Sequence, residues 1–206
     1  MLTKIRQWIL DTFYPFIVWM GKVHMPYSKK KVTANMVEDI LKIIEPGHVL
    51  VSTTYGELSN LFIPGKFRHA AIYVGNGRVV EAIGIGVRNV SIYQFCMTKD
   101  LVVLLDNLEA NHEQMQVVVT NAISCVGKPY DYDFWIPHEH SNSKVNEAFY
   151  CAELVWYCYK QACPNMEFKL RQVMGARTVI PDDFVNANKY WQKLWCSDKV
   201  DCVIKK

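Results

Sequence analysis

Blocks of apolar residues alternate with polar and turn-forming residues through the middle of the chain, and their lengths predict strands. These short β-branched and apolar blocks lie at 48–53, 67–74, 78–82, 87–92 and 101–105. Gly75-Asn76-Gly77 stands between the second and third blocks and indicates a hairpin turn. Because the later blocks are joined by short connections, we expect a small, mostly antiparallel sheet.

Apolar residues recur at a helical spacing on both sides of these blocks. Helices are predicted to begin at or next to Thr33, Asn111, Cys151 and Pro181. Asn111 with Gln114 three residues later has the pattern of a capping box, and Gly127 ends that helix. Pro164 ends the helix that begins at Cys151. A run of consecutive strands with the helices outside it predicts an α+β fold.

Length and composition predict one folded domain with an N-terminal addition. Half of the 206 residues are apolar, which is enough to build one core. We expect an amphipathic helical segment at 1–32 and a single domain at 33–206. The net charge of +3 lacks the basic excess that binds a phosphate backbone, so we expect no nucleic-acid partner.

The first 25 residues share only part of the pattern of a signal peptide. Basic residues precede an apolar run, but Asp11 and Pro15 interrupt it and no small-residue cleavage site follows. The run is also too short to span a bilayer. We therefore expect no signal peptide and no transmembrane helix. Residues 1–25 either pack on the domain or contact a membrane surface through Trp8 and Trp19.

Cysteine usage bears on the compartment in which the protein works. The seven cysteines are odd in number and include no CxxC pair. This pattern predicts neither a disulfide framework nor a zinc site, and it favours a reducing, cytoplasmic location.

The hairpin carries two polar residues that chemistry could use, His69 and Glu81. Their relation depends on the turn: a two-residue loop sets Ile72 opposite Glu81, whereas a three-residue loop sets Ala71 opposite it. The second register makes Glu81 a diagonal neighbour of His69, about 7 to 8 Å away along the sheet and within reach of two long side chains. A carboxylate bonded to one imidazole nitrogen would fix the tautomer and leave the other nitrogen free to act as a base.

Cys151 stands where a loop enters a predicted helix. The free backbone amides and the positive dipole end of a helix N-terminus stabilise a thiolate. A neighbouring imidazolium would add to this effect and give an ion pair ready to attack a carbonyl carbon. The same amides could bind the oxyanion of a tetrahedral intermediate.

Each of these residues also has an interpretation without catalysis. A cysteine on an apolar helix face is more often a packing residue, and a strand histidine is often structural. Glu81 could be a solvated residue or a partner for Arg78 or Arg88. The three residue types together nevertheless match a nucleophile, a base and a group that orients the base.

Six motifs follow one another in a particular order. The three that contain the candidate residues are Arg68-His69-Ala70-Ala71-Ile72-Tyr73-Val74-Gly75, Val80-Glu81-Ala82 and Tyr150-Cys151-Ala152-Glu153-Leu154-Val155. The other three are Pro46-Gly47-His48-Val49-Leu50-Val51, Gly127-Lys128-Pro129-Tyr130-Asp131 and Ile180-Pro181-Asp182-Asp183. In this order, over residues 45–185, they resemble the circularly permuted branch of the NlpC-type papain-like superfamily, the YiiX/YaeF-like cysteine amidases.

This resemblance implies a permuted papain-like catalytic domain and a cysteine peptidase or amidase that needs no cofactor and no metal. It assigns Cys151 as nucleophile, His69 as general base and Glu81 as the orienting group, with Tyr55 and Tyr150 as weaker candidates for contacting the oxyanion or substrate. The family cleaves amide bonds, often in peptides related to bacterial cell walls. Arg68 and Ala152 stand where the family frequently has serine, and we do not expect in this chain the export signal that many members carry.

Three other functions are compatible with parts of this pattern. The same thiolate and histidine could attack a lipid ester or thioester, as an acyl hydrolase or acyltransferase. The fold could also serve as a non-catalytic binding module. Finally, His138, Glu139 and His140 together with a cysteine could bind a metal, although they lie in a predicted polar loop.

Overall fold

A computed structural model of the chain describes most of the predicted domain. The described residues are 32–55, 65–132, 148–168, 170–173, 176–186 and 189–198. The predicted N-terminal segment, apart from Val32, lies outside them, as do His138, Glu139 and His140. No helix within the described ranges has the length and apolar character needed to cross a membrane.

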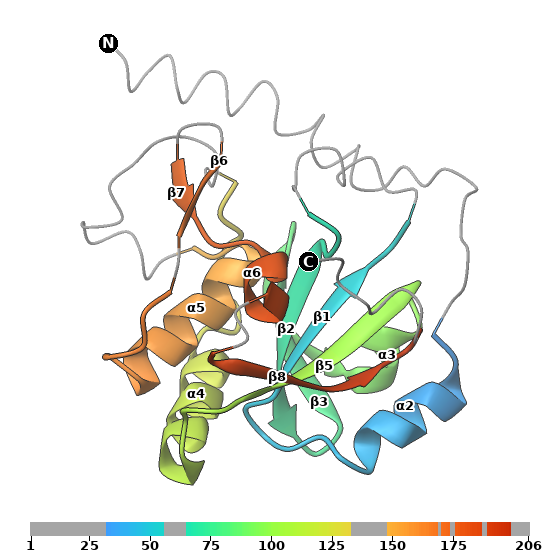
Figure 1. Cartoon of the computed structure of the whole chain (residues 1–206). Coiled ribbons are helices and arrows are strands. Elements are labelled where there is room, and N and C mark those ends of the chain that lie inside the picture. The colour runs from blue at the N-terminus through green and yellow to red at the C-terminus, as the bar shows by residue number, and fades with distance from the viewer. Residues whose placement is uncertain are drawn as a thin grey trace, which may run out of the picture.

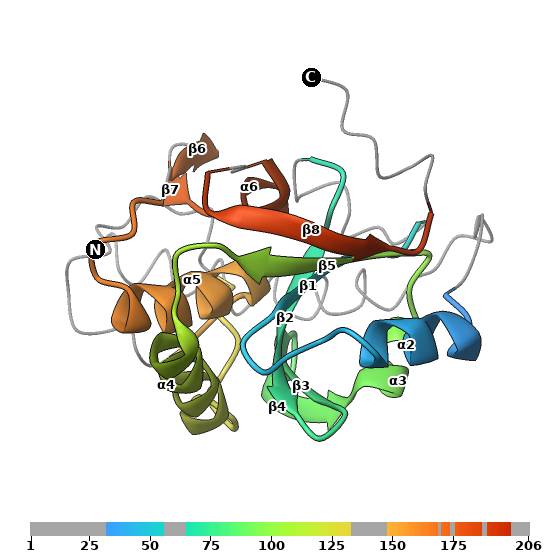
Figure 2. The ribbon, with the colours of Figure 1, turned by 60° about the horizontal axis from the view of Figure 1, so that its bottom comes forward.

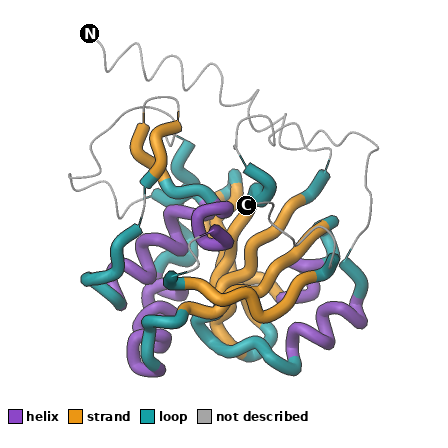
Figure 3. The backbone as a smooth tube through the Cα atoms, viewed as in Figure 1, coloured by secondary structure: helices purple, strands orange, loops and turns teal. Residues whose placement is uncertain are grey.

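A six-stranded sheet with the order β4-β3-β2-β1-β5-β8 forms the centre of the domain (Figures 1 and 3). Its strands are β1 (Val49–Thr53), β2 (His69–Gly75), β3 (Arg78–Ile83), β4 (Gly86–Ser91), β5 (Leu101–Asn107) and β8 (Trp191–Cys196). Every pairing in this sheet is antiparallel, as the sequence predicts for most of it. A separate short hairpin consists of β6 (Arg171–Val173) and β7 (Ala176–Thr178).

Helices cover both faces of the sheet (Figure 2). They are α2 (Ala34–Leu41), α3 (Ile92–Cys96), α4 (His112–Ser124), α5 (Cys151–Ala162) and α6 (Pro181–Asn186). Side chains alternate along each strand, so β2 directs Ala70 and Ile72 toward the core under α4, α5 and α6. Ala71 and Tyr73 point to the opposite core, which α2 and α3 cover. The arrangement is the α+β fold that the sequence predicts.

Local sequence signals position the helix ends. The Thr33 hydroxyl accepts a hydrogen bond from the backbone of Met36, and Asn111 and Gln114 form the predicted capping box. Gly127, just beyond α4, has a φ of 90°, which favours glycine. These ends therefore lie where the sequence places them.

Some elements were not predicted. Ile92 belongs to α3 and not to the preceding strand, because the Ser91 hydroxyl accepts a hydrogen bond from the Gln94 backbone and begins a short helix there. The hairpin β6–β7 and the edge strand β8 were also missed. β8 pairs with β5, far back in the chain, so its local pattern gives little indication of a partner.

The β2–β3 hairpin has the register that places Ala71 opposite Glu81. This confirms the predicted register, but the turn achieves it differently from the expected three-residue loop. Asn76 and Gly77, with φ values of 52° and 67°, form a two-residue turn between the paired residues Gly75 and Arg78. A bulge between Tyr73 and Gly75 then adds the extra residue that shifts the register.

Candidate active site

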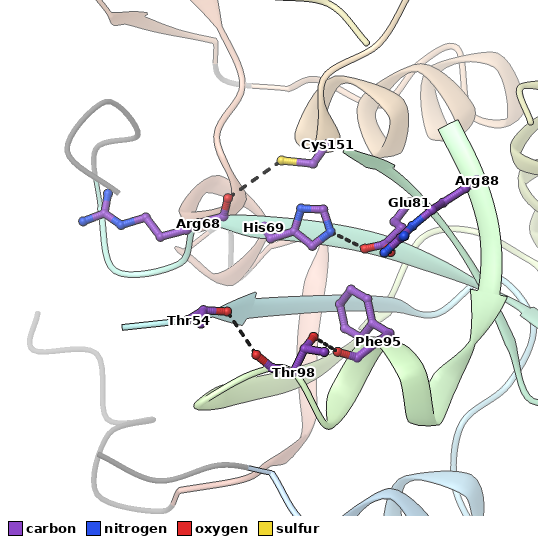
Figure 4. A network of polar contacts seen from close by, with 8 residues as sticks. All are labelled: Thr54, Arg68, His69, Glu81, Arg88, Phe95, Thr98 and Cys151. Atoms are coloured by element: carbon purple, nitrogen blue, oxygen red, sulfur yellow. Dashed lines mark hydrogen bonds and ion pairs between the residues drawn. The ribbon is translucent and has the colours of Figure 1, made fainter. Parts of the chain in front are cut away.

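Three elements bring the candidate residues to one end of the sheet. His69 is the first residue of β2, and Glu81 lies in the neighbouring strand β3. Cys151 is the first residue of α5, which packs against β2 and β3. Residues far apart in the sequence therefore come together around the start of β2 (Figure 4).

The side chains of His69 and Glu81 are joined by a short hydrogen bond. His69 Nε2 lies 2.6 Å from Glu81 Oε2. The Glu81 side chain is only 2% exposed and that of His69 14% exposed, so water competes little for this contact. An ionised carboxylate accepts a hydrogen bond from Nε2–H, which leaves Nδ1 as the ring nitrogen available to another group.

Arg88 holds the second oxygen of Glu81. Its Nε and Nη2 donate to Glu81 Oε1 over 2.9 Å and 2.6 Å. Arg88 stands directly opposite Glu81 in the β3–β4 pairing, whereas the guanidinium of Arg78 binds Asn89. Of the two alternative arginine partners, the structure therefore selects Arg88. The carboxylate serves His69 and Arg88 at once, with one oxygen for each.

The thiol of Cys151 faces the imidazole of His69. In Figure 4 the sulfur and the ring nitrogen not bonded to Glu81 lie on the same side of His69. Cys151 Sγ also lies 3.9 Å from the carbonyl oxygen of Arg68. The residue is 4% exposed, so a substrate carbonyl would meet this sulfur in a largely desolvated place.

The two ionisable partners of this site shift in opposite directions. Burial disfavours the imidazolium of His69, but its hydrogen bonds to Cys151 and Glu81 outweigh burial and raise its pKa to about 9. Burial likewise disfavours the carboxylate of Glu81, but the hydrogen bond and charge of His69, helped by Arg88, lower its pKa to about 2. At neutral pH the pair is therefore an imidazolium beside a carboxylate.

Phe95 and Lys99 support the far side of the His69 ring. The rings of His69 and Phe95 stack with centroids 5.7 Å apart and planes at 29°. Lys99 Nζ lies 5.5 Å from the centre of the Phe95 ring, a cation–π contact. The charge of Lys99 works against the imidazolium and favours the Glu81 carboxylate. Neither residue was singled out from the sequence, because the short helix α3 that carries Phe95 was not predicted.

The backbone before Cys151 is fixed by buried polar contacts. The Tyr150 backbone N–H donates to Glu153 over 3.3 Å, which closes the first turn of α5. The Tyr150 hydroxyl is bound to the Thr178 hydroxyl over 2.6 Å and accepts a hydrogen bond from the Val179 backbone. Burial, followed by the charge of nearby Asp131, raises the pKa of Glu153 to about 8. These contacts hold Tyr150 in place before α5, and its contact with an oxyanion or a substrate stays a prediction.

Tyr55, the other weaker candidate, lies in the loop after β1. Its backbone N–H donates to Asp100 over 2.8 Å. The structure thus fixes the position of its backbone beside β5. Its contact with an oxyanion or a substrate stays a prediction.

The remaining cysteines bear on two other expectations. Cys96, Cys125, Cys158 and Cys163 are free thiols like Cys151. Cys196, in contrast, forms a disulfide bond, a single bridge that the cysteine pattern did not predict. Within the described ranges no three His, Cys, Asp or Glu side chains gather as a metal site.

Comparisons with known proteins give the family. The sequence model of the permuted papain-like amidase enzymes, the YaeF/YiiX or C92 family, matches residues 43–204. Among solved structures the chain is similar to the crystal structure of the metalloprotein YiiX from Escherichia coli O157:H7. That similarity has 23% identity and a TM-score of 0.46, and it covers 61% of this chain and 69% of that one. A search of curated proteins found no match.

The family match spans most of the chain, including all six motifs of the sequence resemblance. It therefore confirms the resemblance to YiiX/YaeF-like amidases and the permuted papain-like fold. The chain belongs to the permuted papain-like amidase family, YaeF/YiiX.

Proposed function

We propose that this protein is a cysteine hydrolase that cleaves amide bonds in peptides, including isopeptide bonds, with Cys151 as nucleophile, His69 as acid and base, and Glu81 as the orienting group. One observation carries the proposal. His69 is held by Glu81 over 2.6 Å while its other ring nitrogen faces the thiol of Cys151 at a helix N-terminus. Membership of an amidase family supports the choice of amide bonds over other acyl compounds.

The proposed first half-reaction forms an acyl-enzyme. The sulfur of Cys151, having given its proton to His69, attacks the carbonyl carbon of the amide. Backbone N–H groups at the start of α5 bind the resulting oxyanion. As the C–N bond breaks, His69 passes its proton to the leaving nitrogen, so the amine departs neutral and the acyl group stays on sulfur.

The second half-reaction reverses these roles. His69, now neutral at Nδ1, removes a proton from a water molecule that attacks the thioester carbon. Collapse of this intermediate breaks the C–S bond, releases a carboxylic acid and restores Cys151. Glu81 keeps Nε2 protonated throughout, so that Nδ1 is always the nitrogen that exchanges protons with sulfur and water.

A covalent intermediate offers the direct test. We expect Cys151 to gain the mass of the acyl group, and no other cysteine to do so, when full-length protein is mixed with a peptide amide and quenched in acid within the first turnovers. Peptide mapping by mass spectrometry locates the adduct, and Cys151→Ala protein is the control. An adduct from a phospholipid or a thioester, with none from any peptide, would favour lipid acyl transfer. No adduct from either would favour a binding module.

Thiol reactivity gives a second test that needs no substrate. Near pH 6 we expect iodoacetamide to alkylate Cys151 before the other described thiols, because it combines a helix N-terminus with the facing imidazolium of His69. Burial raises the pKa of Cys96 to about 12 and also raises the pKa values of Cys158 and Cys163, so these thiols stay protonated.

Cys125 is the informative competitor in this experiment. Its hydrogen bond with Cys158 lowers its pKa to about 7, but its side chain is fully buried. Limiting reagent followed by peptide mapping measures the order of labelling, and His69→Ala should remove the advantage of Cys151. Labelling of Cys125 ahead of Cys151, or unchanged labelling in His69→Ala protein, would contradict an activated thiol at Cys151.

A further inference from the structure

The residue before His69 is an arginine whose backbone forms part of the candidate site. The Arg68 carbonyl oxygen is the atom that lies 3.9 Å from Cys151 Sγ. The Arg68 N–H donates to the Ser52 carbonyl in β1 over 2.9 Å, and the N–H groups of Lys66 and Phe67 are both held by the carboxylate of Asp182. The backbone of Arg68 is therefore fixed from both sides, beside the sulfur.

The guanidinium of Arg68 lacks the partners that other arginines of the chain have. Arg78 binds Asn89, Arg88 binds Glu81, and Arg171 binds Asp183. Among the described residues, Arg68 forms no ion pair, and its Nη1 is buried without a hydrogen-bond partner. Buried polar groups of this kind are rare and indicate a missing ligand or water.

Asp182, the described acid whose charge acts on Arg68, forms no hydrogen bond with its guanidinium. Asp182 is close enough for its charge to be felt by Arg68, but each of its oxygens already accepts a backbone hydrogen bond, one from Lys66 and one from Phe67. Burial outweighs the charge of Asp182 and lowers the pKa of Arg68, which stays protonated at neutral pH because arginine begins so high. Within the described residues the charge of Arg68 is thus offset by Asp182 without a hydrogen bond between them.

The position of this charge relates it to a substrate. In Figure 4 the Arg68 side chain leaves the start of β2 in the direction away from the His69 ring. It starts from the residue whose carbonyl oxygen lies 3.9 Å from Cys151 Sγ, and its guanidinium stands off from the sulfur along the arginine side chain. A peptide acylating Cys151 would extend past this point with the residues that flank its scissile bond.

We propose that Arg68 selects acidic peptides by binding a carboxylate close to the amide bond that Cys151 attacks. This inference rests on the proposed function and specifies its substrate class. The planar guanidinium presents paired N–H donors whose geometry matches the two oxygens of a carboxylate. Binding one would fill the vacant hydrogen-bonding capacity of Nη1 and neutralise the charge.

Paired fluorogenic peptides test this selectivity. In each pair, Glu or Gln occupies one position within two residues of the scissile amide, and kcat/KM is measured with full-length protein. At one position we expect a preference for Glu of about 10- to 100-fold, the size expected of a hydrogen-bonded ion pair. Arg68→Gln should bring the Glu:Gln ratio close to 1, and Arg68→Lys should retain part of it because lysine is only a point charge.

Arg68→Glu distinguishes a lost substrate contact from a misfolded protein, because only a folded enzyme can acquire a new preference. If Arg68 contacts the substrate side chain, this charge reversal should make the enzyme prefer Lys over Glu at the same position. Arg78→Gln is the matched control, since Arg78 lies at the far end of the hairpin and binds Asn89, and it should keep the wild-type ratio. Absence of a Glu preference, or its survival in both Arg68→Gln and Arg68→Glu, would overturn the inference.

Binding to Cys151→Ala protein separates this inference from the proposed function. Fluorescently labelled Glu and Gln peptides are titrated and followed by anisotropy. If wild-type protein cleaves peptides and neither binding nor cleavage depends on Arg68, the amidase proposal stands and the acidic-peptide proposal fails. Binding of Glu peptides that depends on Arg68, without turnover of any peptide, supports the acidic site and removes the amidase proposal. If no peptide is bound or cleaved, both proposals fail.

Discussion

Cys151→Ala and His69→Ala are each expected to reduce turnover of a peptide amide by at least about a thousandfold, and the double mutant should be no worse than either. The reason is that sulfur and imidazole act as one unit: the thiolate forms only when His69 holds the proton, and His69 has no covalent chemistry of its own. Once either is missing, only binding and oxyanion stabilisation remain. The measurement is kcat for wild type, both single mutants and the double mutant on one substrate.

A cysteine on the same helix provides the matched control. Cys158→Ala removes a buried free thiol two turns further along α5, so it reports the effect of losing a packed sulfur without touching His69. It should lower the melting temperature yet retain turnover. Activity in Cys151→Ala protein would exclude covalent catalysis at that residue. Losses that merely follow the melting temperature in all variants would make these residues structural.

Much of the strand arrangement around His69 could be predicted because it depends on local turn chemistry. Asn76 and Gly77 are the residue types that favour a tight hairpin turn, and alternation along the strands fixes which residues share a face. The bulge at Tyr73–Gly75 was not predicted. Its one trace in the sequence is the residue type of Gly75, which adopts a φ of 90° there. The predicted register was correct because a three-residue loop and a two-residue turn with a bulge each add one residue between Tyr73 and Arg78.

The meeting of Cys151 with His69 could not be worked out from pattern alone. It depends on how α5 packs across β2 and β3, which is a tertiary contact between segments about 80 residues apart. The order of the family motifs supplied that expectation instead. Phe95 was missed for a different reason. It lies in α3, and a helix of only five residues has too little periodicity to be predicted.

The pairing of Glu81 with Arg88 shows that two competing interpretations of a residue can both hold. The sequence allowed Glu81 to orient His69 or to neutralise an arginine, and the carboxylate does each with a different oxygen. A carboxylate can do this because both of its oxygens accept. Arg88 therefore fixes the rotation of Glu81 and leaves Oε2 directed at His69, which makes it a positioning residue in the proposed mechanism.

Glu81→Gln should reduce turnover by roughly ten- to a thousandfold, and Glu81→Ala should reduce it further. Loss of the carboxylate also lets the His69 pKa fall from about 9 toward its ordinary value, so the alkaline limb of kcat/KM should move to lower pH. These mutations should also lower the free energy of unfolding, because the ion pair of Glu81 and His69 is lost. The loss should be largest between pH 4.5 and 6.5, where both groups are charged in the folded protein, and it should fade as pH rises through about 9 or falls through about 2. Urea unfolding across this range measures it.

We expect that adding Arg88→Met to Glu81→Gln restores part of the lost turnover, because Arg88 and His69 share the side chain at position 81. A glutamine has a single acceptor oxygen, which Arg88 will take with two donors. Its NH₂ group then faces His69 Nε2 and favours the tautomer with the proton on Nδ1, which cannot accept a proton from Cys151.

Removing Arg88 frees the amide oxygen to accept from Nε2–H, so we expect the Glu81→Gln, Arg88→Met protein to be about tenfold more active than Glu81→Gln alone. Arg88→Met alone should be less active than wild type, because Oε1 loses its partner and the carboxylate can rotate. Arg78→Met, which removes an exposed arginine bound to Asn89, is the control and should rescue nothing. A double mutant that is additively worse than both single mutants would show that Arg88 does not compete for the orienting group.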